Sequence, residues 1–258
     1  MRTRSLPFSR HGSGGFHQTL SRASSGPVLT VRDLGVDAGG RNILRGVSFD
    51  LEEHSSLAII GPNGSGKTLL LKALLGLLPF SGHAAWRAGM RLGYVPQKIY
   101  ADPQLPLRVR ELLVAKAKVQ HLSPELIDNA IAWTAIQDLI DRRLGSLSSG
   151  QLQRVLIAFA LAGAPDALLV DEPTSSLDEL AEERLYELLT RTRDERGTTL
   201  LLVSHDLTLV RGIATHVLCV SGGTAAFGAA EEMLSPQVLE RMYGQPLEFH
   251  SHRLEKRP

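Results

Sequence analysis

The sequence predicts an α/β protein built on a mainly parallel sheet. Two observations carry this prediction. Short apolar runs alternate with helical patterns over residues 167–221, and an apolar strand at 56–60 leads through a glycine-rich turn into a helix at 67–78. Strands that alternate with helices are typical of a parallel sheet covered on both faces. The 258 residues suffice for a large core and lie near the upper size of one domain.

The composition excludes several classes of protein. The formal net charge of +1 gives no electrostatic reason to bind nucleic acid. The chain has a single cysteine, Cys219, so it cannot form an internal disulfide, and we expect the protein in a reducing compartment. The apolar neighbours of Cys219 predict that its thiol is buried. The longest uncharged apolar stretch, 155–164, is about half of the roughly 20 residues that span a bilayer, so we expect no membrane-spanning segment.

The first half of the chain begins with an unusual segment. Residues 1–26 contain four arginines and no acidic residue, which fits a transit peptide, a disordered extension or an over-long start; we expect a disordered extension. Strands are then predicted at 28–31, 43–51 and 56–60. After the helix at 67–78, further helices are predicted at 109–119 and 124–135, and Ser123 and Pro124 are typical of a helix start.

The second half of the chain alternates strands and helices. Strands are predicted at 167–171, 199–204 and 216–221. Helices are predicted at 152–162, 177–193 and 207–214, with further helical segments over 228–243. We expect the folded domain to span 27–243 and residues 244–258 to be a flexible tail.

Residues 61–68 form a phosphate-binding motif. Its glycines let successive backbone N–H groups turn towards a triphosphate, Lys67 adds a point charge, and Thr68 offers a hydroxyl to Mg²⁺. The motif follows a predicted strand and precedes a predicted helix, which is the context that it requires. The sequence therefore predicts a site for a nucleoside triphosphate, made by Gly61, Pro62, Asn63, Gly64, Ser65, Gly66, Lys67 and Thr68.

Four further groups follow in a fixed order. A small turn at 147–151 precedes a helix, so it offers unpaired N–H groups and the positive end of a helix dipole. Asp171 ends a buried apolar run, which places its carboxylate at the carboxyl edge of the sheet, and Glu172 follows on the other side of the strand. Gln97 and His205 each come directly after an apolar stretch. Singly, these groups are also found in ordinary turns and helix caps; in this order they favour triphosphate hydrolysis.

The ordered motifs resemble those of the ATP-binding cassette (ABC) ATPases, over about residues 28–245. The resemblance implies an ABC-type P-loop NTPase with a mainly parallel sheet core, an antiparallel β subdomain and a helical subdomain inserted at about 99–162. It implies ATP and Mg²⁺ as ligands, Glu172 as the catalytic base, and His205 at the γ-phosphate. It further implies Mg²⁺ contacts from Thr68, Gln97 and Asp171, and a catalytic role for Gln97, which also contacts the attacking water. The resemblance also implies a signature sequence that closes on the nucleotide of another subunit, made by Ser148, Ser149, Gly150 and Gln151.

The resemblance also implies partners. A chain with one cassette needs a second copy, so we expect a homodimer, docked on a separate membrane permease at the cytoplasmic face of the inner membrane. Residues 93–109 are similar to the ATPase subunits of bacterial high-affinity zinc importers, which implies zinc uptake with an extracytoplasmic metal-binding protein. An importer of manganese, iron or another nutrient remains an alternative. ABC proteins of translation control or DNA repair normally have tandem cassettes or long insertions, which are not visible here.

The chain departs from the family pattern at three places. Ser149 replaces the usual signature glycine, and we expect a reduced rate rather than loss of activity. The aromatic residue that normally stacks on adenine is missing from the sequence Val-Asp-Ala-Gly-Gly at 36–40, and we expect weaker discrimination between ATP and GTP. His250 and His252 near the C-terminus are either solvated side chains or part of a regulatory zinc sensor.

Overall fold

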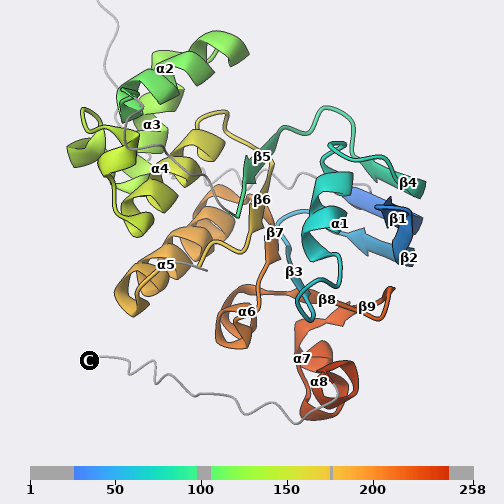
Figure 1. Ribbon diagram of the computed structural model, residues 1–258. Coiled ribbons are helices and arrows are strands. Elements are labelled where there is room, and N and C mark those ends of the chain that lie inside the picture. Colours follow the sequence, from blue (N-terminus) through green and yellow to red (C-terminus); the bar gives the residue numbers. More distant parts are fainter. Residues whose placement is uncertain (1–25, 98–105, 175–176, 244–258) are drawn as a thin grey trace, which may run out of the picture.

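A six-stranded sheet forms the centre of the protein. The computed structural model describes residues 26–97, 106–174 and 177–243. The strands lie in the order β5-β6-β7-β3-β8-β9 (Figure 1). In that order their bounds are Leu92–Val95, Ala167–Asp171, Thr199–Val203, Ser56–Ile60, His216–Ser221 and Thr224–Ala229. Only β9 is antiparallel to its neighbour, which confirms the predicted mainly parallel sheet.

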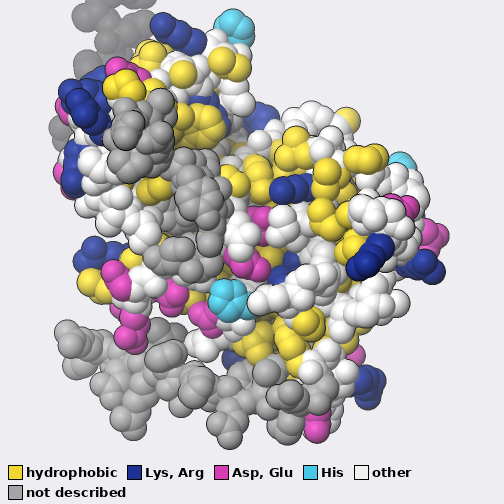
Figure 2. Space-filling model, in the orientation of Figure 1, with side chains coloured by type: hydrophobic (Ala, Val, Ile, Leu, Met, Phe, Trp, Pro, Cys, Tyr) yellow, Lys and Arg dark blue, Asp and Glu magenta, His cyan; other side chains and the backbone are white. Residues whose placement is uncertain are grey.

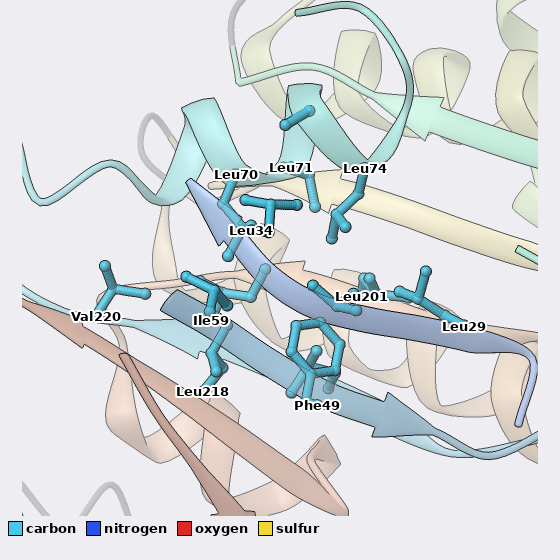
Figure 3. Close-up of a cluster of buried hydrophobic side chains, with 14 of the residues drawn as sticks. Leu29, Leu34, Phe49, Ile59, Leu70, Leu71, Leu74, Leu201, Leu218 and Val220 are labelled. Atoms are coloured by element: carbon cyan, nitrogen blue, oxygen red, sulfur yellow. The ribbon is translucent and has the colours of Figure 1, made fainter. Parts of the chain in front are cut away.

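One face of this sheet packs against helix α1 (Lys67–Leu74) and a second, smaller sheet (Figure 3). Successive side chains of a strand point to opposite faces, so alternate residues of the central strands form this core. Those drawn in Figure 3 include Ile59, Leu201, Leu218 and Val220. They meet Leu70, Leu71 and Leu74 of the helix.

The opposite face is covered by helices α4 (Ser149–Leu161), α5 (Glu179–Arg196) and α6 (Leu207–Ile213). Along the central strands, the residues that alternate with those of the first core point towards these helices, among them Leu168, Leu200 and Leu202. Since both faces are covered, the strands β3, β6 and β7 are buried along their whole length. This explains why their sequences are continuous apolar runs rather than alternating ones.

The smaller sheet is antiparallel, as predicted, with the order β2-β1-β4. Strands β1 (Leu29–Ala38) and β2 (Arg41–Leu51) are longer than the predicted strands and are joined by Gly39 and Gly40. These glycines have φ angles of 59° and 72°, which a two-residue hairpin turn requires. The edge strand β4 (Ser81–Trp86) was not predicted, because its exposed and partly exposed residues show no alternation. Strand β5 was missed because it has only four residues.

The helices between β5 and β6 have a core of their own. They comprise α2 (Val109–Gln120), α3 (Pro124–Thr134), two 3₁₀ turns (Gln137–Leu139 and Leu144–Ser146) and part of α4. Val109 and Leu113 of α2 pack with Val155 and Ala158 of α4 in this cluster. The predicted helices at 109–119 and 124–135 are therefore confirmed, with an inserted helical region as the resemblance implied.

The C-terminal part differs from the prediction. Residues 228–243 were expected to be helical, but β9 extends through Ala229 and pairs with β8. The sequence contains a signal for this hairpin, the pair Gly222-Gly223 after β8. In the structure these glycines form the turn, with φ angles of 57° and 80°. Helices α7 (Ala230–Met233) and α8 (Pro236–Tyr243) then follow.

Among the helices of the described residues, none is both long enough and apolar enough to cross a bilayer. Several predictions lie outside those residues: the extension at 1–25, the part of the 93–109 segment that follows Gln97 up to residue 105, and the tail with His250 and His252.

Candidate functional site

The phosphate-binding motif connects β3 to α1 in a tight loop. Gly61 has a φ angle of 150°, and a Cβ atom there would lie 2.0 Å from the carbonyl oxygen of Val220. Gly64 and Gly66 also have positive φ angles, of 78° and 102°, and Gly66 is the N-cap of α1. Glycine is therefore required by sterics at Gly61 and by backbone conformation at the other two positions. The loop ends at the helix N-terminus, which favours a bound anion.

Lys67 folds back over this loop. Its Nζ donates to the carbonyl oxygens of Gly61 at 2.9 Å and Pro62 at 3.1 Å, and lies 3.9 Å from a carboxylate oxygen of Glu172. The side chain is only 5% exposed. Burial lowers the pKa of Lys67, and the charges of Glu172 and Asp171 oppose that shift. The ammonium group therefore already lies in the loop that would surround a triphosphate.

Asp171 and Thr68 provide oxygen atoms beside the loop. The Thr68 hydroxyl donates to Oδ1 of Asp171 at 3.0 Å. The other carboxylate oxygen, Oδ2, is buried and has no hydrogen-bond partner among the described residues. Burial is the main cause that raises the pKa of Asp171, with the Thr68 hydrogen bond opposing it. A buried carboxylate with a free oxygen next to a hydroxyl fits Mg²⁺, which prefers oxygen ligands.

Glu172 lies at the end of β6 next to Gln97, which follows β5. The Gln97 Nε2 donates to Oε2 of Glu172 at 2.6 Å. Glu172 has a φ angle of 41°, which is unusual for a residue with a side chain. Its backbone N–H is fixed by the carbonyl oxygen of Val203 in the neighbouring strand, at 3.0 Å. The sheet thus holds Glu172 in a strained conformation that turns its carboxylate towards Lys67 and Gln97.

His205 lies in the turn between β7 and α6. Its side chain is exposed and, with Gly61, Pro62 and Asn63 of the phosphate loop, lines a hollow of about 240 Å³. The next residue, Asp206, is the N-cap of α6 and accepts from the N–H groups of Thr208 and Leu209 at 2.8 and 3.2 Å. The turn therefore presents an imidazole next to the phosphate loop.

The signature turn forms the start of α4, and the helix begins at Ser149 rather than at the predicted residue 152. Ser148 is the N-cap: its hydroxyl accepts from the Gln151 N–H at 3.3 Å, and the Gln151 side chain accepts from the Ser148 N–H at 3.1 Å. This capping box explains the early start. Gly150 packs closely on α5, because a Cβ atom there would lie 3.0 Å from Cβ of Ala181. Ser149 is exposed.

The structure thus brings together some of the sequence-predicted residues and separates others. Two contacting sets, Thr68 with Asp171 and Gln97 with Glu172 and Lys67, are joined by the charge interaction between Lys67 and Asp171. His205 lines a hollow with the loop. Three of the signature residues, Ser148, Gly150 and Gln151, line a different hollow, of about 200 Å³, between α4 and the start of α5.

Sequence reasoning missed one residue next to this site. The Tyr186 hydroxyl, on α5, donates to Oδ2 of Asp206, immediately after His205. Tyr186 follows the helical pattern of α5 as an ordinary half-buried residue, so no signal in the sequence distinguished it.

A strand, phosphate loop and helix with a carboxylate at the end of a neighbouring parallel strand define a P-loop nucleoside triphosphatase. Comparison with protein families narrows this class. Residues 44–175, about half of the chain, match the model of the ABC transporter family. The chain therefore belongs to the ABC transporter family and is an ABC-type ATPase.

Its relatives include proteins named zinc import ATP-binding protein ZnuC. The one from Jannaschia sp. (strain CCS1) is 37% identical over 218 residues, covering 84% of this chain and 88% of the relative. The one from Hahella chejuensis is 36% identical, covering 84% of each chain, and that from Brucella abortus (strain 2308) is 36% identical, covering 87% and 76%.

Solved structures give the same fold. A metal-chelate type ABC transporter in an inward-facing conformation matches with a TM-score of 0.78 and 27% identity, over 85% of this chain and 90% of the other. A nucleotide-free ATP-binding cassette from an ABC transporter has a TM-score of 0.72, over 83% of this chain and 97% of the other; at 23% identity it supports the fold alone.

Proposed function

We propose that this chain is the ATP-hydrolysing subunit of a zinc importer and that it drives zinc through a separate membrane permease. The observation that carries the zinc assignment is the group of relatives named as zinc import ATP-binding proteins, which match more than four fifths of the chain at 35 to 37% identity. The assignment as an ATPase follows from membership of the ABC transporter family.

ATP binds at the loop of residues 61–68. Its backbone N–H groups and the α1 N-terminus surround the phosphates. Lys67 leaves the carbonyl oxygens of Gly61 and Pro62 and donates to the phosphate oxygens instead. Thr68, Gln97 and Asp171 would hold Mg²⁺, which would supply positive charge that offsets the charge of the phosphates.

Hydrolysis depends on residues at the carboxyl ends of β6 and β7. Glu172 accepts a hydrogen bond from the attacking water and aligns it with the γ-phosphate. Gln97 orients Glu172 through the hydrogen bond of 2.6 Å. Lys67 and His205 stabilise the charge that develops on the γ-phosphate oxygens, so that catalysis is mainly positioning and electrostatics.

A second copy of the chain completes each site. Ser148, Gly150 and Gln151 line a hollow that contains none of the residues of the phosphate loop, and Ser149 is exposed beside them at the start of α4. In the proposed homodimer, these residues of one copy close on the nucleotide held by the other. The N-terminus of α4 then adds a second positive helix end at the γ-phosphate.

The chain acts at the cytoplasmic face of the inner membrane, bound to its permease. An extracytoplasmic metal-binding protein delivers zinc on the other side. We expect no nucleic-acid partner, because the net charge of +1 gives no electrostatic reason for one; on the face in Figure 2 the described basic side chains are interspersed with acidic ones.

Two alternative functions use the same site. The chain could energise import of manganese, iron or another nutrient, because the ATPase site does not contact the transported substrate. A role in translation control or DNA repair is less well supported, because the relatives described above are named as transport proteins.

Metal uptake by metal-starved cells tests the proposal. Cells that lack this chain are complemented with the wild type or with Glu172→Gln, and zinc, manganese and iron uptake are measured in the same samples. Zinc uptake restored by the wild type alone is the expected result. If another metal responds, the ATPase assignment stands and the substrate is reassigned; if no metal responds, the metal-import assignment is wrong.

A further inference from the structure

The turn that carries His205 is fixed by the side chain of Asp206. Both carboxylate oxygens of Asp206 are engaged: Oδ1 accepts from the N–H groups of Thr208 and Leu209, and Oδ2 accepts from the hydroxyl of Tyr186. On the other side of His205, Ser204 is buried, and its hydroxyl accepts from the Asp206 N–H at 3.0 Å. The His205 side chain itself is exposed, so its position depends on these neighbours.

Helix α5 holds α6 at both ends. Tyr186 of α5 contacts the N-cap residue Asp206, and Arg193, two turns further along α5, donates to the carbonyl oxygen of Ile213 at the last turn of α6. Between these contacts, Leu185 and Leu189 of α5 share a core with Leu209 of α6. Because α6 is attached to α5 at three places, the His205 turn is expected to follow any displacement of α5.

The same helix also contacts the signature turn. Gly150 packs on Ala181 in the first turn of α5, with only 3.0 Å between Cβ of Ala181 and a Cβ placed at Gly150. Ala181 and Tyr186 are five residues apart, or about 7.5 Å along a helix. Helix α5 therefore connects the signature turn at one end to the His205 turn at Tyr186.

We propose that Tyr186 is a positioning residue for ATP hydrolysis: its hydrogen bond to Asp206 fixes the turn that presents His205 to the γ-phosphate and ties that turn to the helix that supports the signature. This inference rests on the proposed role of His205. It is independent of the transported metal. Tyr186 does not touch the nucleotide and acts only through the turn.

The first test is the Tyr186→Phe variant of the full-length chain. It keeps the ring and removes only the hydroxyl. We expect kcat for ATP to fall about tenfold, as for loss of one hydrogen bond to a charged group, with unchanged affinity for ADP, which has no γ-phosphate. The matched control is Arg193→Gln, which loosens α6 from the same helix at the end away from His205 and is expected to keep kcat near the wild-type value.

A double-mutant cycle with His205→Ala separates positioning from general loss of stability. If Tyr186 acts through His205, then Tyr186→Phe has no further effect in the His205→Ala background. Single-turnover measurements with labelled ATP resolve the slow variants. Additive effects of the two changes, or an equal loss of kcat in Arg193→Gln, would overturn the inference. If His205→Ala alone leaves kcat unchanged, the proposed role of His205 is wrong and the inference fails with it.

Tyr186→Leu, which removes both the ring and the hydroxyl, provides a second variant for the same cycle. ADP affinity reports whether each variant is folded at the phosphate loop. A Tyr186→Phe enzyme with wild-type kcat and intact ADP binding would overturn the inference without affecting the assignment of the ATPase site.

Discussion

The side-chain amide of Gln97 donates a hydrogen bond of 2.6 Å to the carboxylate of Glu172, 75 residues further along the chain. The other oxygen of this carboxylate lies 3.9 Å from Nζ of Lys67. The orientation of Glu172 thus depends both on the segment that follows β5 and on the phosphate loop. Since Gln97 also begins the connection to the helical region, displacement of that region is expected to alter the position of the proposed base.

Glu172→Gln is expected to lower ATP turnover by about 100-fold or more, because general-base catalysis contributes about that much. The amide keeps the shape of the side chain, so ATP binding is retained. Phosphate release and equilibrium nucleotide binding measure the two effects separately. Glu183→Gln, an exposed change of the same kind on α5, is the control and should keep wild-type turnover. If Glu172→Gln keeps turnover within about threefold of the wild-type value, the catalytic base is another residue.

The two substitutions Gly61→Ala and Gly212→Ala should change stability in opposite directions. A methyl group at Gly61 would overlap the carbonyl oxygen of Val220, and its φ angle of 150° disfavours alanine. We expect a loss of roughly 2 to 4 kcal/mol in the free energy of unfolding. Gly212 lies in α6 with open space around it, so alanine is expected to add up to about 1 kcal/mol.

Urea unfolding of both variants measures these changes. A stable Gly61→Ala protein with intact ATP binding would show that the β3 to α1 loop tolerates a side chain at its first position.

Ser149→Gly is expected to raise kcat by a few-fold, because it restores the usual residue of the signature. Ser149 is exposed at the start of α4, where the proposed partner nucleotide would approach. Steady-state ATP turnover measures the effect, at a protein concentration high enough that turnover per subunit no longer rises. Ser146→Gly, in the preceding 3₁₀ turn, serves as the control. An unchanged kcat would indicate that the serine side chain does not meet the nucleotide or the other subunit.

The stability of the protein should fall as the pH rises from about 9 to about 11. Burial raises the pKa of the Cys219 thiol to about 11, above its ordinary value near 9. The folded state therefore keeps this proton more tightly than the unfolded state, so the stabilisation is complete below about 9 and is lost as the pH passes through the folded value.

Urea unfolding across this pH range measures the loss, which should be smaller in Cys219→Ala. Burial also raises the pKa of Tyr94 and of Tyr243 to about 12, so part of the decline above pH 10 should persist in that variant. Equal slopes in the two proteins would show that the thiol is not the cause.

Discrimination between ATP and GTP is expected to be weak. The adenine-stacking aromatic of the family is missing, and the structure places Asp37, Ala38 and two glycines at the end of the β1–β2 hairpin instead. Competition between ATP and GTP for the purified chain measures the preference. Ala38→Tyr is expected to increase it by adding a ring that can stack on adenine. A strong preference for ATP in the wild type would contradict this prediction.

The parts of the site that are contiguous in sequence could be predicted well. The phosphate loop is one such part, because its backbone conformation depends on local glycines and on the adjoining strand and helix. Asp171 is another, because the end of a buried apolar run marks the carboxyl edge of the sheet. The edge strand β4 was missed, because its exposed residues carry no periodic signal.

The sequence by itself determined the fold class, the phosphate loop and the order of the motifs, since glycine geometry and apolar runs act over short distances along the chain. Only the tertiary structure decided that Gln97 bonds to Glu172, that Gly150 packs on Ala181 and that Tyr186 holds Asp206. These contacts join residues 20 to 75 positions apart. They depend on strand order and on how the helices pack, and no local pattern of residues encodes either.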